Sequence, residues 1–355
     1  MVYWNSQEVV QAVIGGALIA LSTTLNLLLF GRITGISGIL SSVTKYDTSQ
    51  GFYWKYCFIL GLLTIPKILQ VIFGSYIDLG DGYYFPMFDS NELAMKQTHI
   101  AAWFIGGFLV GVGVRMGNGC TSGHGVCGIP RLATRSIVAT CTFMITGFAL
   151  ASLKYHEPFL SNGETFGDTY YEVWRWLTLA ILILGHIYGG FVLISKDEKH
   201  IRLECIWSYV FGLLFGLGLL ISGMCRISKI LNFLIIDSVV WDPTLIFVMG
   251  SAVAINVVTF YFIQKRKYPI YGEKFSIPPR KGKVDLRLVC GAAIFGIGWG
   301  FAGLCPGPGL VNFFHETHGL FWVLSLFIGM FTFDYGLKFY EDKKKKTEVT
   351  YVRTN

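Results

Sequence analysis

The residues that could carry chemistry in this sequence are concentrated in two glycine-rich segments, each centred on a cysteine. The first segment, Gly117–Arg131, reads GNGCTSGHGVCGIPR, and the second, Gly303–Gly309, reads GLCPGPG. A neutral thiol is a weak hydrogen-bond donor, whereas a thiolate is a nucleophile and a metal ligand. The two segments could therefore bind an anion, ligate a metal or carry thiol chemistry.

The first segment offers several kinds of ligand group. Its candidate binding residues are Gly119, Cys120, Thr121, Ser122, His124 and Cys127. Glycines let backbone N–H groups converge at a helix end, where they can cradle an anion, and the two hydroxyls add further donors. Close packing of helices also favours glycine, so a purely structural role is the alternative. The two cysteines and the histidine supply at most three zinc ligands, so we expect no metal and no cofactor.

The second segment contains two prolines and three glycines around Cys305. Proline removes a backbone donor, and both residue types favour turns. The composition predicts a tight, non-helical connection that presents Cys305.

The elements that position these segments belong to a membrane protein. The chain has 355 residues, of which 53% are hydrophobic and 14% are charged, and its mean hydropathy is +0.54. Soluble domains carry about 25% charged residues, so we expect an all-α polytopic protein whose main partner is the lipid bilayer. The net charge of +7 comes from short basic blocks between apolar runs, which is typical of topology signals rather than of nucleic-acid binding.

A transmembrane helix needs about 20 mostly apolar residues, and the sequence contains nine such runs. They are Val9–Phe30, Trp54–Phe73, His99–Met116, Ile137–Leu153, Val173–Ile194, Ile206–Met224, Thr244–Ile263, Leu286–Leu304 and Leu320–Phe339. Two further runs, Ile33–Val43 and Ile227–Ile236, are too short to span and are predicted to be re-entrant or interfacial.

The basic residues fall in the linkers after the odd-numbered spans, including the run from Lys265 to Arg287 and the block from Lys343 to Lys346. Acidic residues predominate in the other linkers. By the positive-inside rule, the C-terminus is expected in the cytoplasm and the N-terminus outside. The plasma membrane is the expected location.

The two cysteine segments are parts of an internal repeat. At a constant offset of 185 residues, Gly106, Gly111, Gly113 and Cys120 align with Gly291, Gly296, Gly298 and Cys305. Upstream, FGRITGISGIL resembles MCRISKILNFL, with Arg32 opposite Arg226.

We therefore expect a first four-helix repeat over residues 1–170, a connector helix over 171–202, a second four-helix repeat over 203–342 and a polar cytoplasmic tail over 343–355. The odd number of spans inverts the second repeat, which is a common plan in transporters. The two cysteine segments would then be re-entrant hairpins that approach the centre of the membrane from opposite faces.

The segments Gly117–Arg131 and Gly296–Pro308, supported by Gly223–Val248 and FGRITGISG, resemble the YeeE/YedE family of membrane proteins, whose characterised members take up thiosulfate. The resemblance implies an hourglass fold with a narrow centre. It also implies that thiosulfate passes by successive contacts with pore cysteines, which are Cys120 and Cys305 by residue-to-residue correspondence. Cys225 is the candidate for a third contact. A sulfur-carrier or sulfurtransferase partner on the cytoplasmic side is a further expectation.

The chemistry of the ion is consistent with neutral thiols. Thiosulfate is a dianion, which a thiolate would repel, and its entry into an apolar core is costly unless donors replace water. Weak donors in series suit conduction, because each site must also release the ion. The cations expected to lower the barrier are Arg32, Lys67, Arg115, Arg131 and Arg226. Anchoring to lipid headgroups is the alternative role for the arginines, and snorkelling for the lysine.

Two other classes of function compete with transport. The first is a membrane thiol enzyme or persulfide carrier that uses Cys120 with His124 as its base. The second is a structural or assembly protein without transport. The repeated cysteine segments favour a transporter, which is not expected to be an enzyme.

Overall fold

Long apolar runs of this sequence fold into long helices. The computed structural model describes the chain except residues 1–4, 45–50, 74–75, 79–83, 90–98, 158, 160–167, 196–198, 314–316 and 355. The long helices are α1 (Ser6–Phe30), α3 (Gly51–Phe73), α5 (Ile100–Met116), α6 (Thr134–His156), α7 (Asp168–Ser195), α8 (Lys199–Ile221), α10 (Thr244–Ile263), α11 (Leu286–Ala302) and α13 (Thr317–Thr354). The short elements are α2 (Ile36–Thr44), β1 (Tyr76–Asp78), β2 (Tyr84–Pro86), η1 (Thr121–Gly128), η2 (Ile129–Arg131), α9 (Ile227–Leu234) and α12 (Pro306–Asn312).

The described residues contain eight helices that are long and apolar enough to cross a membrane. Helix α5 and the segment Thr121–Arg131 (η1 and η2) pass the same test together with a bend of 51°, and they give a ninth crossing if they are one broken span rather than a re-entrant loop. The prediction of an all-α polytopic membrane protein with about nine crossings is therefore confirmed. The two runs judged too short to span are α2 and α9, with nine and eight residues.

Two antiparallel helix pairs form the centre of the bundle. In the pair α1–α8, Gly15 lies against Gly218, and in the pair α5–α11, Gly113 lies against Gly291. At each of these positions a side chain would collide with the partner's backbone. Small residues are what allow membrane helices to approach this closely.

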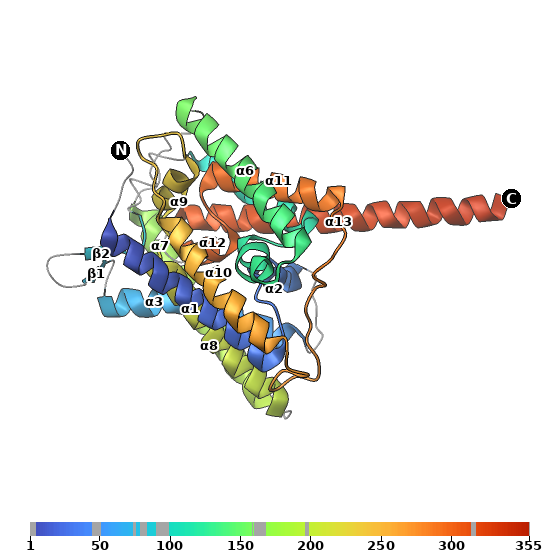
Figure 1. Cartoon of the computed structure of the whole chain (residues 1–355), viewed down its shortest axis with the longest axis horizontal. Coiled ribbons are helices and arrows are strands. Elements are labelled where there is room, and N and C mark those ends of the chain that lie inside the picture. Colours follow the sequence, from blue (N-terminus) through green and yellow to red (C-terminus); the bar gives the residue numbers. More distant parts are fainter. Residues whose placement is uncertain are drawn as a thin grey trace.

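Four parallel pairs surround this centre, and they fall into matched sets. Helix α1 packs on α10 and α8 packs on α3, while α5 packs on α13 and α11 packs on α6 (Figure 1). The counterparts in the two predicted repeats are α1 and α8, α3 and α10, α5 and α11, and α6 and α13. When each helix is replaced by its counterpart, the pair α1–α10 becomes α8–α3, and the pair α5–α13 becomes α11–α6. This arrangement supports two halves inserted in opposite orientations, which we retain as a proposal.

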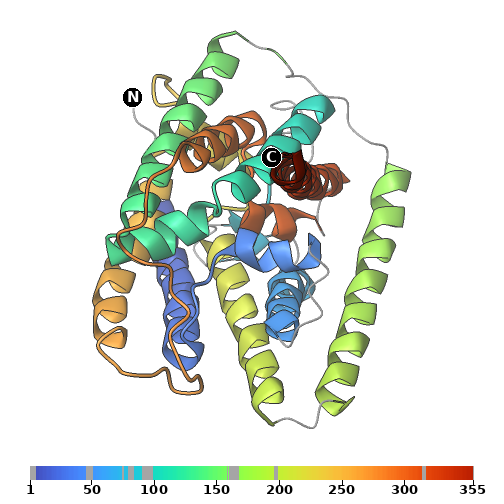
Figure 2. The same cartoon turned by 90° about the vertical axis from the view of Figure 1, so that its right-hand side faces the viewer.

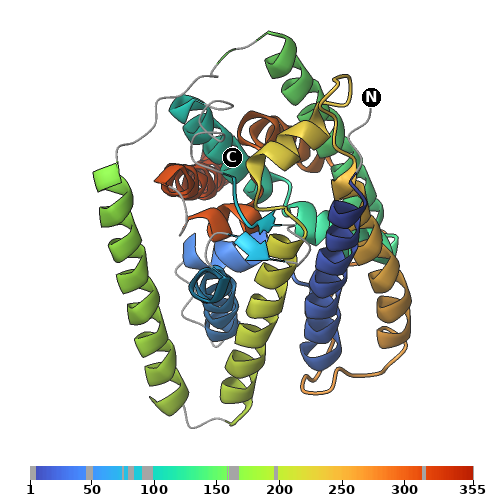
Figure 3. The same ribbon diagram turned by 90° about the vertical axis from the view of Figure 1, so that its left-hand side faces the viewer.

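Helix α7 joins the two halves and lies at the edge of the bundle (Figures 2 and 3). Its side chains are mostly exposed, as expected for a helix whose surface faces lipid, although Tyr56 of α3 donates a hydrogen bond to the Gly185 carbonyl at 2.9 Å. Helix α13 continues through the segment predicted as a polar tail and projects beyond the bundle (Figure 1).

Candidate functional site

The two cysteine segments adopt the same backbone shape. Asn118 after α5 and Gly303 after α11 both have left-handed backbone, with φ of 56° and 65°. Cys120 and Cys305 then have extended backbone, with φ of −139° and −105°, and each directly precedes a short helix. The offset of 185 residues found in the sequence therefore recurs in the backbone conformation.

The prediction that GLCPGPG is non-helical throughout is wrong. Only Gly303–Cys305 interrupts the helices, and α12 begins at Pro306. The reason is that proline fits the first position of a helix, where its missing N–H would have no partner and its φ is already helical.

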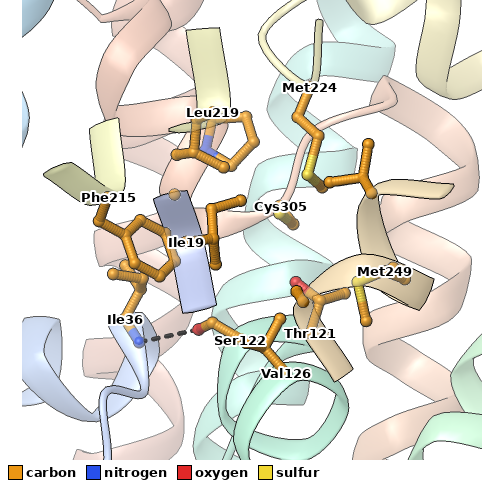
Figure 4. Close-up of a pocket in the computed structure, with 14 residues that line it drawn as sticks. Ile19, Ile36, Thr121, Ser122, Val126, Phe215, Leu219, Met224, Met249 and Cys305 are labelled. Atoms are coloured by element: carbon orange, nitrogen blue, oxygen red, sulfur yellow. Dashed lines mark hydrogen bonds between the residues drawn. The ribbon is translucent and has the colours of Figure 1, made fainter. Parts of the chain in front are cut away.

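The two breaks meet at a small cavity in the middle of the bundle (Figure 4). Its volume of about 20 Å³ is enough for roughly one water molecule. The cavity is lined by Ile19, Ile36, Thr121, Ser122, Val126, Phe215, Leu219, Met224, Val248, Met249, Ala252, Cys305, Gly307 and Pro308. The lining is mainly apolar, and its polar and polarisable groups are two hydroxyls and the sulfur atoms of Met224, Met249 and Cys305.

Consecutive residues of η1 contact the two cysteines. The Thr121 hydroxyl lies against the Cys305 thiol. The Ser122 Oγ is 3.2 Å from the Cys120 Sγ and accepts a hydrogen bond from the Ile36 N–H at 3.0 Å (Figure 4). The start of η1 therefore joins both cysteine breaks to α2, and both thiols are almost completely buried.

Cys127 is also buried, but it is directed elsewhere. Its thiol donates to the Thr34 carbonyl at 3.6 Å. Behind it, the Asn256 amide donates to the Val126 carbonyl at 2.9 Å and to the Thr23 hydroxyl at 3.0 Å. These bonds fix η1 against α1 and α10, so the position of Cys127 is consistent with a structural role.

A cavity of about 610 Å³, which we call the basic vestibule, lies on one side of η1. Its charged lining residues are Lys55, Arg131, Arg135 and Lys283, and Gly119 and His124 line it as well. The His124 ring nitrogens lie 3.1 Å from the Ser136 Oγ and 3.3 Å from the Gly117 carbonyl. This geometry places the His124 ring in the vestibule and gives it partners other than Cys120.

A second cavity of about 280 Å³, which we call the acid–base mouth, lies at the other end of α1. It is lined by Glu8, Arg226, Ser228, Lys229, Asn232, Val239, Val240 and Asp242. Glu8 is in the first turn of α1, whereas the basic vestibule begins at Ile33, just after the helix ends. The 25 residues of α1 therefore separate the two openings by roughly 37 Å.

The other predicted cations are not among the lining residues of the three cavities and have partners of their own. Arg115 forms a two-pronged ion pair with Asp334 of α13, with distances of 2.7 to 2.9 Å. Arg32 binds Glu204 at 2.8 Å and stacks over Trp54. Lys67 donates to Gln70 at 3.3 Å. Of the cations named from the sequence, Arg131 and Arg226 line an opening.

Several site residues escaped sequence reasoning. Ile36 contributes a backbone N–H, and a backbone group cannot be recognised from the residue type. Asn256 hydrogen-bonds η1 from within an otherwise apolar predicted span. Of the two methionines of the central cavity, Met224 directly precedes Cys225 and could have been flagged, whereas Met249 lies within α10, where no local signal marks it.

Comparison with known proteins adds independent information. A family model described as sulphur transport matches residues 3–150, and a second model, a family of unknown function, matches residues 203–346. A protein of Xylella fastidiosa strain 9a5c named "Probable transporter" is 42% identical over 113 residues, which cover 32% of this chain and 77% of the relative. A protein of the same name from strain Temecula1 is 41% identical over 143 residues, covering 39% of this chain and 90% of the relative.

Proposed function

Because this chain belongs to the YeeE/YedE family of sulphur-transport membrane proteins, we propose that it carries thiosulfate, or a closely related sulfur anion, across the bilayer by contacts with buried thiols. The family and the named relatives point to an integral membrane transporter rather than to an enzyme. The identity of the anion and the role of the cysteines are our proposal.

The observation that carries the proposal is the order of three cysteines between the two openings. Cys225 lies between Arg226 of the acid–base mouth and Met224 of the central cavity. Cys305 lines the cavity itself. Cys120 lies between Gly119 of the basic vestibule and Thr121 of the cavity. A sulfur ligand could therefore meet a thiol at each stage.

The central cavity must widen during transport. Its volume of about 20 Å³ holds one water, whereas thiosulfate has five heavy atoms. Met224 and Met249 have flexible, polarisable side chains, so they can change rotamer without a rigid-body motion of the helices. A narrow, mainly apolar centre also hinders the leakage of water and other ions between passages.

The distribution of charge supports a direction for the protein in the membrane. Among the residues that the structure describes, the lining of the basic vestibule includes four cationic side chains and no carboxylate. With the positive-inside rule, we propose that this side faces the cytoplasm, as does the C-terminus, and that the membrane is the plasma membrane. A sulfur-carrier or sulfurtransferase partner would collect the anion there.

Purified protein in liposomes provides the test of this function. Radiolabelled thiosulfate should accumulate faster than in protein-free liposomes, and excess unlabelled thiosulfate, but not chloride, should compete with it. Flux equal to that of the protein-free liposomes would contradict the proposal.

A further inference from the structure

The acid–base mouth contains an unusually dense group of buried charges. The Lys229 side chain is 2% exposed, and its Nζ lies 2.9 Å from the Glu8 carboxylate and 4.0 Å from that of Asp242. Arg226 lies 3.4 Å from Glu8 and 3.6 Å from Asp89. Among the described residues, three carboxylates thus surround two cations, and this excess of negative charge would repel an entering anion.

The three carboxylates are held differently. Asp89 accepts hydrogen bonds from the Ser228 N–H, at 2.7 Å, and from the Ser228 hydroxyl. Asp242 accepts from the Thr244 N–H at 2.9 Å and from the Thr244 hydroxyl at 2.6 Å.

Glu8 differs from them, because within the described part of the chain its carboxylate is bound by Lys229 and Arg226 alone. Its two oxygens, one on each cation, occupy the positions that the oxygens of a bound oxyanion would take.

A polar group without a partner lies beyond Glu8. Gln11 is 7% exposed, and neither its amide nitrogen nor its amide oxygen has a hydrogen-bond partner in the described structure. Glu8, Gln11, Gly15 and Ile19 share one face of α1, because they are three or four residues apart. Gln11 is therefore placed between the acid–base mouth, which begins at Glu8, and the central cavity, which Ile19 lines.

We propose that Glu8 couples anion entry to a proton. A proton from water neutralises the Glu8 carboxylate, and its hold on Arg226 and Lys229 is lost. The two cations then bind the incoming oxyanion, which passes the Gln11 amide on its way to the central cavity. Asp89 and Asp242 keep their hydrogen bonds to Ser228 and Thr244. Once the anion has left, the proton is released toward the cytoplasmic side, so that one proton enters with the anion and the ion pairs form again.

This inference rests on the proposed function, and the following measurements separate the two. Uptake of labelled thiosulfate is measured in liposomes at several external pH values, while a pH-sensitive dye inside reports proton movement. We expect uptake to rise as pH falls, by at most about tenfold per unit for one proton, and proton entry to follow thiosulfate addition.

Glu8→Gln is the diagnostic variant, because it imitates the protonated carboxyl. It should still take up thiosulfate, but at a rate that no longer depends on pH. Glu204→Gln is the matched control, since Glu204 is also a buried carboxylate paired with an arginine, Arg32, but lines neither opening. The control should retain the pH dependence of the wild type.

Two results would overturn the inference and leave the transport function standing. One is wild-type thiosulfate uptake that is independent of pH and moves no protons. The other is a Glu8→Gln variant with wild-type pH dependence. If the wild type shows no thiosulfate flux at any pH, the proposed function itself fails.

Discussion

Ser122 is the residue at which structure and proposed function meet most directly. Its hydroxyl oxygen accepts the Ile36 N–H and touches the Cys120 thiol. It therefore fixes the start of α2 and the orientation of a proposed conduction thiol at the same time. Among the described residues, no other side chain hydrogen-bonds both the Ile36 N–H and the Cys120 thiol.

Replacement of Ser122 by alanine should lower both stability and uptake. A buried backbone N–H left without its acceptor costs about 1–3 kcal/mol, so the melting temperature in detergent should fall. Ser41→Ala is the control, because that hydroxyl only donates to the Gly38 carbonyl of its own helix. Unchanged uptake and melting temperature in Ser122→Ala would contradict the assigned role.

At the residue scale, the sequence points to the cysteines and hydroxyls near the central cavity, but it does not show which cations have acidic partners. The repeat and the glycine content mark these residues, and in the structure Thr121, Ser122 and Cys305 line one cavity while the Cys120 thiol contacts Ser122. Arg115 is instead paired with Asp334, which is 219 positions away in sequence. The packing of the helices decides which carboxylate pairs with a given arginine, and local sequence patterns do not predict that packing.

The breaks after α5 and α11 are the elements that bring the thiols to the centre. Each break needs a residue with left-handed backbone, and the sequence uses Asn118 in one and Gly303 in the other. The existence of the breaks was predictable from glycine, but their detail was not. The π-helical turn of η1 depends on bonds such as that from Asn256, and α12 uses Pro306 to begin a helix where turn statistics predicted a loop.

Gly303→Ala should damage the second break. A β-carbon there would be 3.0 Å from side-chain atoms of Ile227 and Leu231, and left-handed backbone adds roughly 1–2 kcal/mol for a residue other than glycine. We expect a lower melting temperature and slower uptake. Gly250→Ala is the matched control, because its β-carbon would meet nothing within 4 Å. Equal behaviour of the two variants would contradict the account.

Over the whole molecule, the ends of the central pair α1–α8 carry reciprocal ion pairs. Arg226 after α8 binds Glu8 at the start of α1, and Arg32 after α1 binds Glu204 at the start of α8. These pairs, the matched helix contacts and the two family models that cover separate halves all support inverted repeats joined by α7. The relatives named above are themselves shorter than half of this chain, since 143 residues make up 90% of one of them.

The two halves should therefore assemble as separate chains. Residues 1–165 and 199–355, produced together without α7, should copurify through an affinity tag on either half and restore thiosulfate uptake. The helices that meet across the halves, such as α5 with α11, supply the contact surface. Each half produced alone is the control. Failure of the two halves to copurify would show that α7 is more than a connector.

We propose above all that the thiols of Cys120 and Cys305, at the central cavity, conduct the anion. A comparison of three cysteine variants in liposomes tests this most directly. Cys305→Ala and Cys120→Ala remove buried thiols at the cavity, whereas Cys141→Ala removes an exposed thiol on the outer face of α6. We expect thiosulfate flux to be lost in the first two variants and kept in the third, with all three proteins folded. Wild-type flux in both Cys120→Ala and Cys305→Ala would contradict it.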